Sequence, residues 1–276
     1  MIQIKKIALS LMAFSTLGVA STTVDQKLVA DIAVAKEEKT AAEAKLKALQ
    51  AKLPQNQDIM SHVKFGYIQT DGNTDTEVIS LDGTIEKAWG DNSLKFVFDA
   101  QYGKADNLVN KKKYFTELQY AYLLTNTLSF TYVVGYKYDF FSSYDYQSYT
   151  GPGLKWATYK SDRQKLDLEG AILYSQDKLA TVTPPDDDIN TYSAYLAKLT
   201  YELQIIENLK FKQDLSYRSA FEDSNNYFIF SESQLSSKIS DIFSAGLSYK
   251  IDYTNEVTAG IEQRDNTLSA FLSIDY

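Results

Sequence analysis

The chain has 276 residues, no cysteine, one histidine, 21 tyrosines and 14 phenylalanines, and its formal net charge is −8. Lys and Arg are interleaved with Asp and Glu, which excludes nucleic acid as an expected partner because DNA and RNA binding needs a basic stripe. A disulfide framework is excluded as well, so a large hydrogen-bonded structure has to hold the chain together.

The first twenty residues have the pattern of a secretory signal peptide. Lys5 and Lys6 precede an apolar run over residues 7–19, and small residues lead to an expected cleavage before Ser21. The run is too short for a membrane-spanning helix. Residues 1–20 are therefore predicted to be an export signal, which sends the rest of the chain out of the cytoplasm.

A helix is predicted for residues 25–53, inside a segment that covers residues 21–57. The helix is rich in Ala, Lys and Glu, and it lacks Gly and Pro until Pro54. Its heptad seam consists of Leu28, Ile32, Ala35, Lys39, Ala42, Leu46, Leu49 and Leu53. Such a seam predicts a coiled coil that joins chains into a homo-oligomer or contacts another protein. Because alanines and Lys39 weaken the seam, a solvated helix that folds back on the rest of the chain is the alternative.

From residue 58 onward, about twelve segments alternate apolar and polar residues. They begin near Ser61, Asp75, Ser93, Lys113, Leu128, Gln147, Arg163, Asn190, Leu209, Tyr227, Phe243 and Thr267. Most segments run for about ten to thirteen residues, which exceeds ordinary soluble strands and suits a tilted bilayer crossing. An even strand number is the rule for bacterial single-chain barrels. Residues 58–276 are thus predicted to form a closed antiparallel transmembrane β-barrel, in an all-β fold preceded by the periplasmic helix.

The connections between these segments alternate in length, as expected of an outer-membrane barrel with short periplasmic turns and longer external loops. The short, Asn- or Asp-bearing turns are 89–92, 125–127, 160–162, 206–208 and 240–241, and the longer connectors are 105–112, 140–146, 176–189, 222–226 and 254–266. With even strand parity, both termini are predicted to face the periplasm, on the same side as the helix.

The two faces of the predicted strands differ in polarity. One face is apolar, as in Leu118, Tyr120 and Tyr122, and it is assigned to lipid. The other face is charged and supplies the candidates for a lumen, which are Lys95, Asp99, Glu117, Lys137, Asp139, Lys165, Asp167, Glu169, Lys210, Lys212, Asp214 and Arg218. Alternation alone does not distinguish inside from outside, so the assignment rests on the signal peptide, the strand length and the terminal Tyr276.

Four short motifs carry a resemblance to a known family. They are Gly72-Asn-Thr-Asp75, Trp89-Gly-Asp-Asn92, Gly151-Pro-Gly-Leu154 and Asp265-Asn-Thr267 before the last strand. In this order, from Val63 to Tyr276, the chain resembles the salt-induced outer-membrane protein family, also called YdiY-like, whose function is largely unassigned. The resemblance implies an outer-membrane barrel and transfers no catalytic or ligand-binding residue. The helix over residues 25–53 departs from the barrel-only pattern.

Catalysis is not expected. Outer-membrane phospholipases and proteases need a constellation that includes histidine, because imidazole exchanges protons near neutral pH. The single histidine, His62, lies at the start of the first predicted strand, and there is no cysteine. Carboxylates such as Asp167 and Glu169 lie among lysines, which favours ion pairs inside a lumen. We predict no enzyme, no catalytic residue and no cofactor.

Two acidic segments invite a comparison with metal sites. Asp71, Asn73 and Asp75 have the spacing of a calcium loop, but Thr76 occupies a position where such a loop needs glycine. Residues 186–188 are three consecutive aspartates in the longest connector, where they either hold a divalent cation against lipopolysaccharide or form a solvated loop tip. No metal site is predicted.

The sequence therefore predicts a barrel in the outer membrane of a Gram-negative-type envelope, most simply a narrow passive pore. About twelve strands enclose a lumen of intermediate width, which long charged side chains would narrow. A non-conducting structural or envelope-stress protein that uses the helical stalk for contacts is the alternative, and an outer-membrane enzyme is a minor one. The expected partners are outer-membrane lipid, lipopolysaccharide, the barrel-assembly machinery and further copies of the chain.

Overall fold

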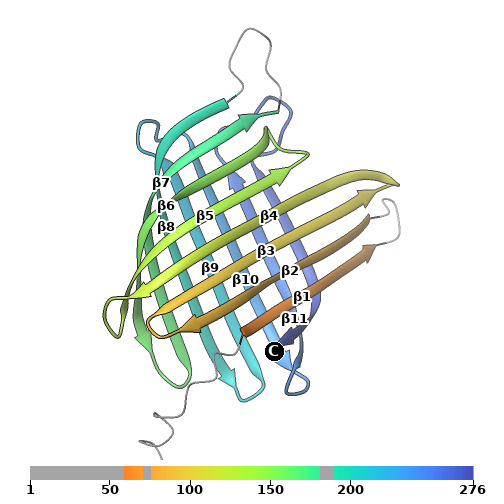
Figure 1. The fold of residues 1–276 in the computed structure, drawn as a ribbon. Coiled ribbons are helices and arrows are strands. Elements are labelled where there is room, and N and C mark those ends of the chain that lie inside the picture. Colours follow the sequence, from red (N-terminus) through yellow and green to blue (C-terminus); the bar gives the residue numbers. More distant parts are fainter. Residues whose placement is uncertain (1–58, 71–75, 181–188, 276) are drawn as a thin grey trace, which may run out of the picture. The chain divides into compact units, whose positions relative to one another are not determined.

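The computed structural model describes residues 59–70, 76–180 and 189–275. In these residues the chain forms twelve strands (Figure 1). They are β1 (Ile59–Thr70), β2 (Thr76–Trp89), β3 (Asn92–Ala105), β4 (Leu108–Leu123), β5 (Leu128–Asp139), β6 (Tyr144–Lys160), β7 (Gln164–Leu179), β8 (Ile189–Ile206), β9 (Leu209–Ala220), β10 (Tyr227–Lys238), β11 (Phe243–Thr254) and β12 (Arg264–Asp275). The predicted signal peptide, the predicted helix and Tyr276 lie outside the described residues.

Every strand pairs antiparallel with its neighbours in the sequence, and β1 pairs with β12 to close the barrel. The closing register sets Val63 opposite Ile274 and Tyr67 opposite Ala270. The predicted all-β, closed antiparallel barrel of about twelve strands is confirmed. Because the strand number is even, β1 begins and β12 finishes at the same end of the barrel, which Figure 1 shows at the bottom. Within the described residues, no helix is long and apolar enough to cross a membrane.

Six strands have 12 residues, within the range that the alternation suggested, and the other six are longer, with 14 to 18 residues. The largest difference lies between β3 and β4, where residues 105–112 were expected to form a long connector. The structure has a two-residue turn there, Asp106 and Asn107, with φ angles of 48° and 66°. Two positive φ values at Asp and Asn match the tight hairpin turn whose twist suits paired strands. The three lysines that follow the turn therefore belong to β4.

Alternate residues of the strands face opposite sides of the barrel wall, with charged side chains inside and apolar side chains outside. On β5, Phe130, Tyr132 and Val134 are between 37% and 49% exposed, whereas Thr131 and Val133, which lie between them, are fully buried. Exposed and buried residues alternate in the same way over eight residues of β12. A barrel of this kind is apolar on its outer surface, which is the reverse of a water-soluble protein.

The Gly151-Pro-Gly-Leu154 motif lies within β6, where the chain passes close to β7. A Cβ added at Gly151 would lie 2.0 Å from the carbonyl oxygen of Ile172, so a larger residue has no room there. Pro152 has no N–H, and in this stretch the register of β6 and β7 resumes at Gly153 opposite Ala171. The motif thus permits a close strand approach at a point where the regular ladder is interrupted.

Candidate functional site

The interior of the barrel holds a cavity of about 280 Å³, which we call the lumenal cavity. Its lining comes from both sides of the closed sheet. Seven basic residues line it, Lys64, Lys95, Lys113, Lys137, Lys198, Lys212 and Arg218, together with six acidic residues, Asp82, Asp99, Glu117, Asp214, Glu232 and Asp252. Because the numbers of positive and negative side chains are nearly equal, most of these residues form ion pairs inside the cavity.

The first group of ion pairs joins five strands through two buried lysines. Lys64 of β1 lies 2.6 Å from Asp82 of β2 and 2.8 Å from Glu232 of β10. Lys250 of β11 pairs with Asp99 of β3 and lies 3.3 Å from Asp82. Lys64 is 3% exposed and Lys250 is 4% exposed, so these charges depend on one another for solvation. Because these partners lie up to four strands apart, this group also ties the walls together across the interior.

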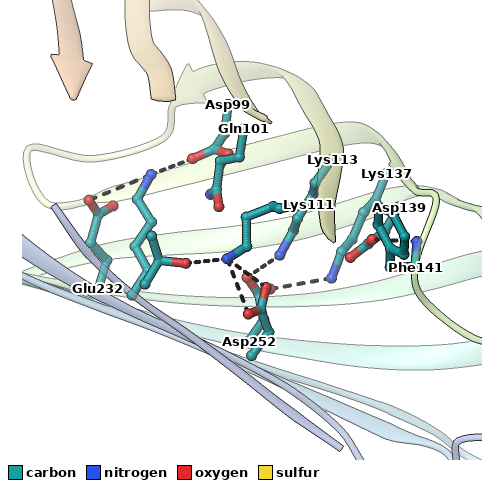
Figure 2. Close-up of polar contacts among 12 residues, drawn as sticks. Asp99, Gln101, Lys111, Lys113, Lys137, Asp139, Phe141, Glu232 and Asp252 are labelled. Atoms are coloured by element: carbon teal, nitrogen blue, oxygen red, sulfur yellow. Dashed lines mark hydrogen bonds and ion pairs between the residues drawn. The ribbon is translucent and has the colours of Figure 1, made fainter. Parts of the chain in front are cut away.

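The second group, which we call the Asp252 bridge, connects opposite walls. Asp252 of β11 accepts hydrogen bonds from Lys113 of β4 and, at 3.3 Å, from Lys137 of β5 (Figure 2). In a ring of twelve strands, β5 is the strand opposite β11. Lys111 adds a further link at the same end of β4, because it lies 3.1 Å from Asp265 and 2.6 Å from the hydroxyl of Thr267 on β12. The lumen is therefore narrow enough for side chains to span it.

The third group centres on Glu117 of β4. This carboxylate accepts hydrogen bonds of 2.5 Å from Lys198 of β8 and of 2.5 Å from the hydroxyl of Tyr149 on β6. Tyr149 reaches Glu117 by passing over Gly135 of β5, since a Cβ at Gly135 would lie 2.2 Å from the tyrosine ring. The absence of a side chain at position 135 thus creates the seat for this ring.

The fourth group surrounds Asp177, which is 1% exposed on β7. Asp177 accepts hydrogen bonds from Tyr192 at 2.7 Å and from Gln147 at 3.2 Å, and Arg218 lies 3.9 Å away. The Arg218 guanidinium lies 4.4 Å from the centre of the Phe228 ring. Beside this group the inner wall is apolar, and its cluster comprises Val133, Ala171, Leu173, Tyr192, Ala194, Leu196 and Ala220. Part of the interior is therefore filled by packed side chains.

The residues expected to face a lumen fall into two sets in the structure. Seven of the twelve line the lumenal cavity, namely Lys95, Asp99, Glu117, Lys137, Lys212, Asp214 and Arg218. The remaining five, which are Asp139, Lys165, Asp167, Glu169 and Lys210, lie outside its lining. Asp167 contacts Lys165 at 3.4 Å, and Lys210 contacts Glu202 at 2.8 Å. Glu169 accepts a hydrogen bond of 2.7 Å from Gln119, and Asp139 lies opposite Lys113 on the neighbouring strand. Asp139 and Glu169 are paired in register with Lys113 and Lys198, which do line the cavity.

Several residues of the interior escaped the sequence reasoning. Lys113 was placed at the start of a predicted strand, Lys198 lies in a largely apolar stretch of β8, and neither was among the residues expected to face the lumen. Lys64, Tyr149 and Glu232 were not considered, although each keeps the phase of the inward-facing positions of its strand. Counting every second residue from Glu117 leads to Lys113 on β4, but the other residues lie on other strands, each of which needs an inward position of its own to fix its phase.

His62 and the acidic segments need separate mention. The Nδ1 atom of His62 lies 2.5 Å from a carboxylate oxygen of Asp275, and both side chains are at least 41% exposed. This pair joins β1 to β12 at the end of the barrel where the strands of the described chain begin and finish. Residues 71–75 and 186–188 lie outside the described part of the chain. Within that part, no group of three or more His, Cys, Asp or Glu residues is placed to hold a metal ion.

The fold and its interior define a class, which is a closed twelve-stranded antiparallel barrel with a charged lumen and an apolar outer surface. The chain belongs to the family described as "Protein of unknown function, DUF481", whose model matches residues 63–276. This match agrees with the YdiY-like resemblance that the four motifs indicated. No curated protein matches the chain significantly.

Solved structures with similar folds include a NanC porin, with a TM-score of 0.46 and 12% identity, covering 78% of this chain and 98% of that one. An outer membrane channel from Pseudomonas putida F1 has a TM-score of 0.44 and 10% identity, covering 81% of this chain and 99% of that one. The translocator domain of the autotransporter NalP from Neisseria meningitidis has a TM-score of 0.41 and 11% identity, covering 87% and 97%. At these identities and scores, we carry no substrate or activity over to this chain.

Proposed function

We propose that the barrel spans the outer membrane of a Gram-negative-type envelope and acts as a narrow passive pore. The observation that carries the proposal is the inverted polarity of the barrel, with charged residues around the lumenal cavity and exposed apolar residues on the outer face. A lipid bilayer is the surrounding in which such an outer face costs no free energy. Strands of 12 to 18 residues are long enough for a tilted crossing.

A row of tyrosines on the outer face supports this placement. Tyr195, Tyr217, Tyr227 and Tyr253 come from the four consecutive strands β8 to β11, and their successive ring centres lie 5.9, 5.7 and 5.8 Å apart. Tyr217, Tyr227 and Tyr253 lie within three residues of the strand ends that lead into the longer loops, and Tyr195 lies six residues inside β8. Aromatic rings gather where lipid meets water. The row thus fits one edge of the apolar band, with the longer loops outside the cell and the short turns in the periplasm.

A charge placed in the middle of the outer face tests the membrane placement. Val134 lies at the middle of β5 and is 49% exposed. Val134→Lys is expected to lower the free energy of unfolding by about 2 to 4 kcal/mol in lipid vesicles, because a lysine at the bilayer midplane is poorly solvated. Urea titration of the refolded chain in vesicles measures this change.

The matched control for that experiment is Leu108→Lys. Leu108 is 74% exposed and follows the tight turn at Asp106 and Asn107, so its lysine would reach water. Its expected cost is about 0 to 1 kcal/mol. Equal costs for the two variants would contradict the membrane placement, since an exposed valine of a soluble barrel accepts lysine readily.

Whether the barrel acts as a pore is tested by its ion conductance. Lumenal side chains retain partial exposure, for example 33% for Lys212 and 22% for Lys137, which supports a wetted interior. The Asp252 bridge narrows this path, so any current is expected to be small. Planar-bilayer recordings on the purified mature chain test the pore, and small discrete current steps are the expected result. A folded barrel that stays silent would contradict it.

The Asp252 bridge also favours a second candidate function, a non-conducting structural protein of the envelope. In that case the helix predicted for residues 25–53 would supply the contacts, either with further copies or with a periplasmic partner. Deleting residues 25–53 is then expected to reduce the mass of the detergent-solubilised assembly while the barrel stays folded. Light scattering coupled to gel filtration measures that mass, and an unchanged oligomer after deletion would count against the stalk.

A further inference from the structure

Lys95 differs from the other basic residues that line the lumenal cavity. Within the described residues it forms no ion pair, whereas each of the other six has a carboxylate within 4 Å. Its directly paired neighbours are Glu86 on β2 and Gln119 on β4, and the Gln119 amide donates to Glu169 instead. The charge of Lys95 is therefore left without a direct partner.

The surroundings of Lys95 add positive charge from across the lumen. The charges of Lys155, Lys198 and Lys212, on β6, β8 and β9, all act on Lys95. Each of these three lysines already has its own carboxylate: Lys155 contacts Asp167 at 3.1 Å, Lys198 contacts Glu117 at 2.5 Å, and Lys212 contacts Asp214 at 2.7 Å. Attraction from Glu86, Glu117 and Asp214 offsets part of the repulsion, but among the described residues no carboxylate oxygen lies within 4 Å of the Lys95 ammonium group.

The lumenal cavity offers space for an anion beside Lys95. The carboxylate partner of Arg218 is Asp177, and Asp99 pairs with Lys250, so what distinguishes Lys95 among the lining residues is its missing carboxylate. The cavity of about 280 Å³ has room for several waters at about 30 Å³ each, so a small hydrated ion fits beside this lysine.

We propose that Lys95, together with Lys198 and Lys212 on the lining of the same cavity, forms a binding station for a small oxyanion, of which inorganic phosphate is the simplest representative. The anion would supply the charge that Lys95 lacks, with the other two lysines adding attraction while they keep their carboxylates. If the proposed pore conducts, this station gives it a preference for anions. That transport role rests on the proposed pore, whereas the binding itself does not.

Phosphate binding to the full mature chain in detergent tests the station. Inorganic phosphate is expected to raise the thermal unfolding midpoint of the wild-type chain above its value in sodium chloride of equal ionic strength. Lys95→Gln is expected to weaken this response at least tenfold in phosphate concentration, and Lys95→Arg, which keeps the charge, is expected to retain it.

Lys87→Gln is the matched control, because Lys87 lies on the neighbouring strand β2 and is exposed outside the lumenal cavity. It is expected to respond to phosphate as the wild type does. A Lys95→Gln chain that folds and keeps the full phosphate response would overturn the station. If Lys95→Gln fails to fold, the wild-type chain and Lys95→Arg are titrated with phosphate by calorimetry. No measurable heat of binding in either chain would also overturn the proposed station.

Reversal potentials in a potassium chloride gradient separate the station from the pore. The wild-type chain is expected to favour chloride, and Lys95→Gln is expected to shift the potential toward potassium. A phosphate response in a chain that carries no current would support the station and remove the pore. Current without any phosphate response, and with unchanged potential in Lys95→Gln, would keep the pore and overturn the station.

Discussion

Asp252→Asn is expected to lower the free energy of unfolding by about 3 kcal/mol, because it removes the carboxylate shared by two lysines inside the barrel. Lys113 and Lys137, which lie on the neighbouring strands β4 and β5, would then repel each other with only a neutral amide from the opposite wall beside them. Asp252 is 19% exposed, and the Lys113 side chain is 5% exposed, so water screens this repulsion poorly. Urea titration of the chain in vesicles measures the change.

The Asp252→Asn prediction has a control in an exposed ion pair. Lys238 and Asp241 lie 3.3 Å apart at the β10 to β11 turn, with side chains 53% and fully exposed. Asp241→Asn is expected to cost no more than about 1 kcal/mol, as surface ion pairs do. In the Asp252→Asn background, a further Lys137→Met change is expected to recover part of the lost stability. Equal costs for the two Asp→Asn variants would show that the Asp252 bridge carries no special weight.

Gly135→Ala is expected to lower the free energy of unfolding by about 3 kcal/mol, through overpacking and the loss of a charge-assisted hydrogen bond. A Cβ at this position would lie 2.2 Å from Cζ of Tyr149, and two other ring carbons lie at 2.6 Å. The ring has to leave its seat, and its hydroxyl then loses Glu117. Denaturant titration in vesicles again gives the size of the effect.

Gly170→Ala provides the matched control for the Gly135 experiment. Gly170 also lies within a strand, but the nearest atom to a Cβ there is 4.0 Å away. Its expected cost is within about 0.5 kcal/mol, as for most surface changes. Combining Gly135→Ala with Tyr149→Ala is expected to cost far less than the sum of the two single changes, because the clash disappears with the ring. Additive costs would show that the Tyr149 ring does not rest on Gly135.

The alternation of apolar and polar residues was enough to predict the strands, their number and the closure of the barrel. It failed at residues 105–112, where Lys111 and Lys112 were interpreted as part of a loop and Lys113 as the first residue of the following strand. In the structure Lys111 and Lys113 are inward-facing and find partners on β12 and β11. A run of charges in a water-soluble protein marks a surface, but in this barrel the inner wall is where charge belongs.

The partners of the lumenal charges were beyond prediction from the sequence. Lys64 and Glu232 are 168 positions apart, and Lys113 and Asp252 are 139 apart. Local pattern contains no information about such pairs, because they depend on the strand register and on the width of the closed barrel. The sequence also could not show that Lys95 lacks an ion-pair partner. Lys95 faces inward like the other lumenal lysines and differs from them only because no carboxylate across the lumen pairs with it.

The most direct test of the proposed pore is single-channel conductance of the refolded mature chain in planar bilayers, recorded beside Asp252→Asn and with or without residues 25–53. The account predicts small discrete steps for the wild type and larger steps for Asp252→Asn, since that change opens the bridge between the two walls. A folded wild-type barrel and a folded Asp252→Asn barrel that are both silent would contradict the pore and leave the structural role of the envelope protein as the function to pursue.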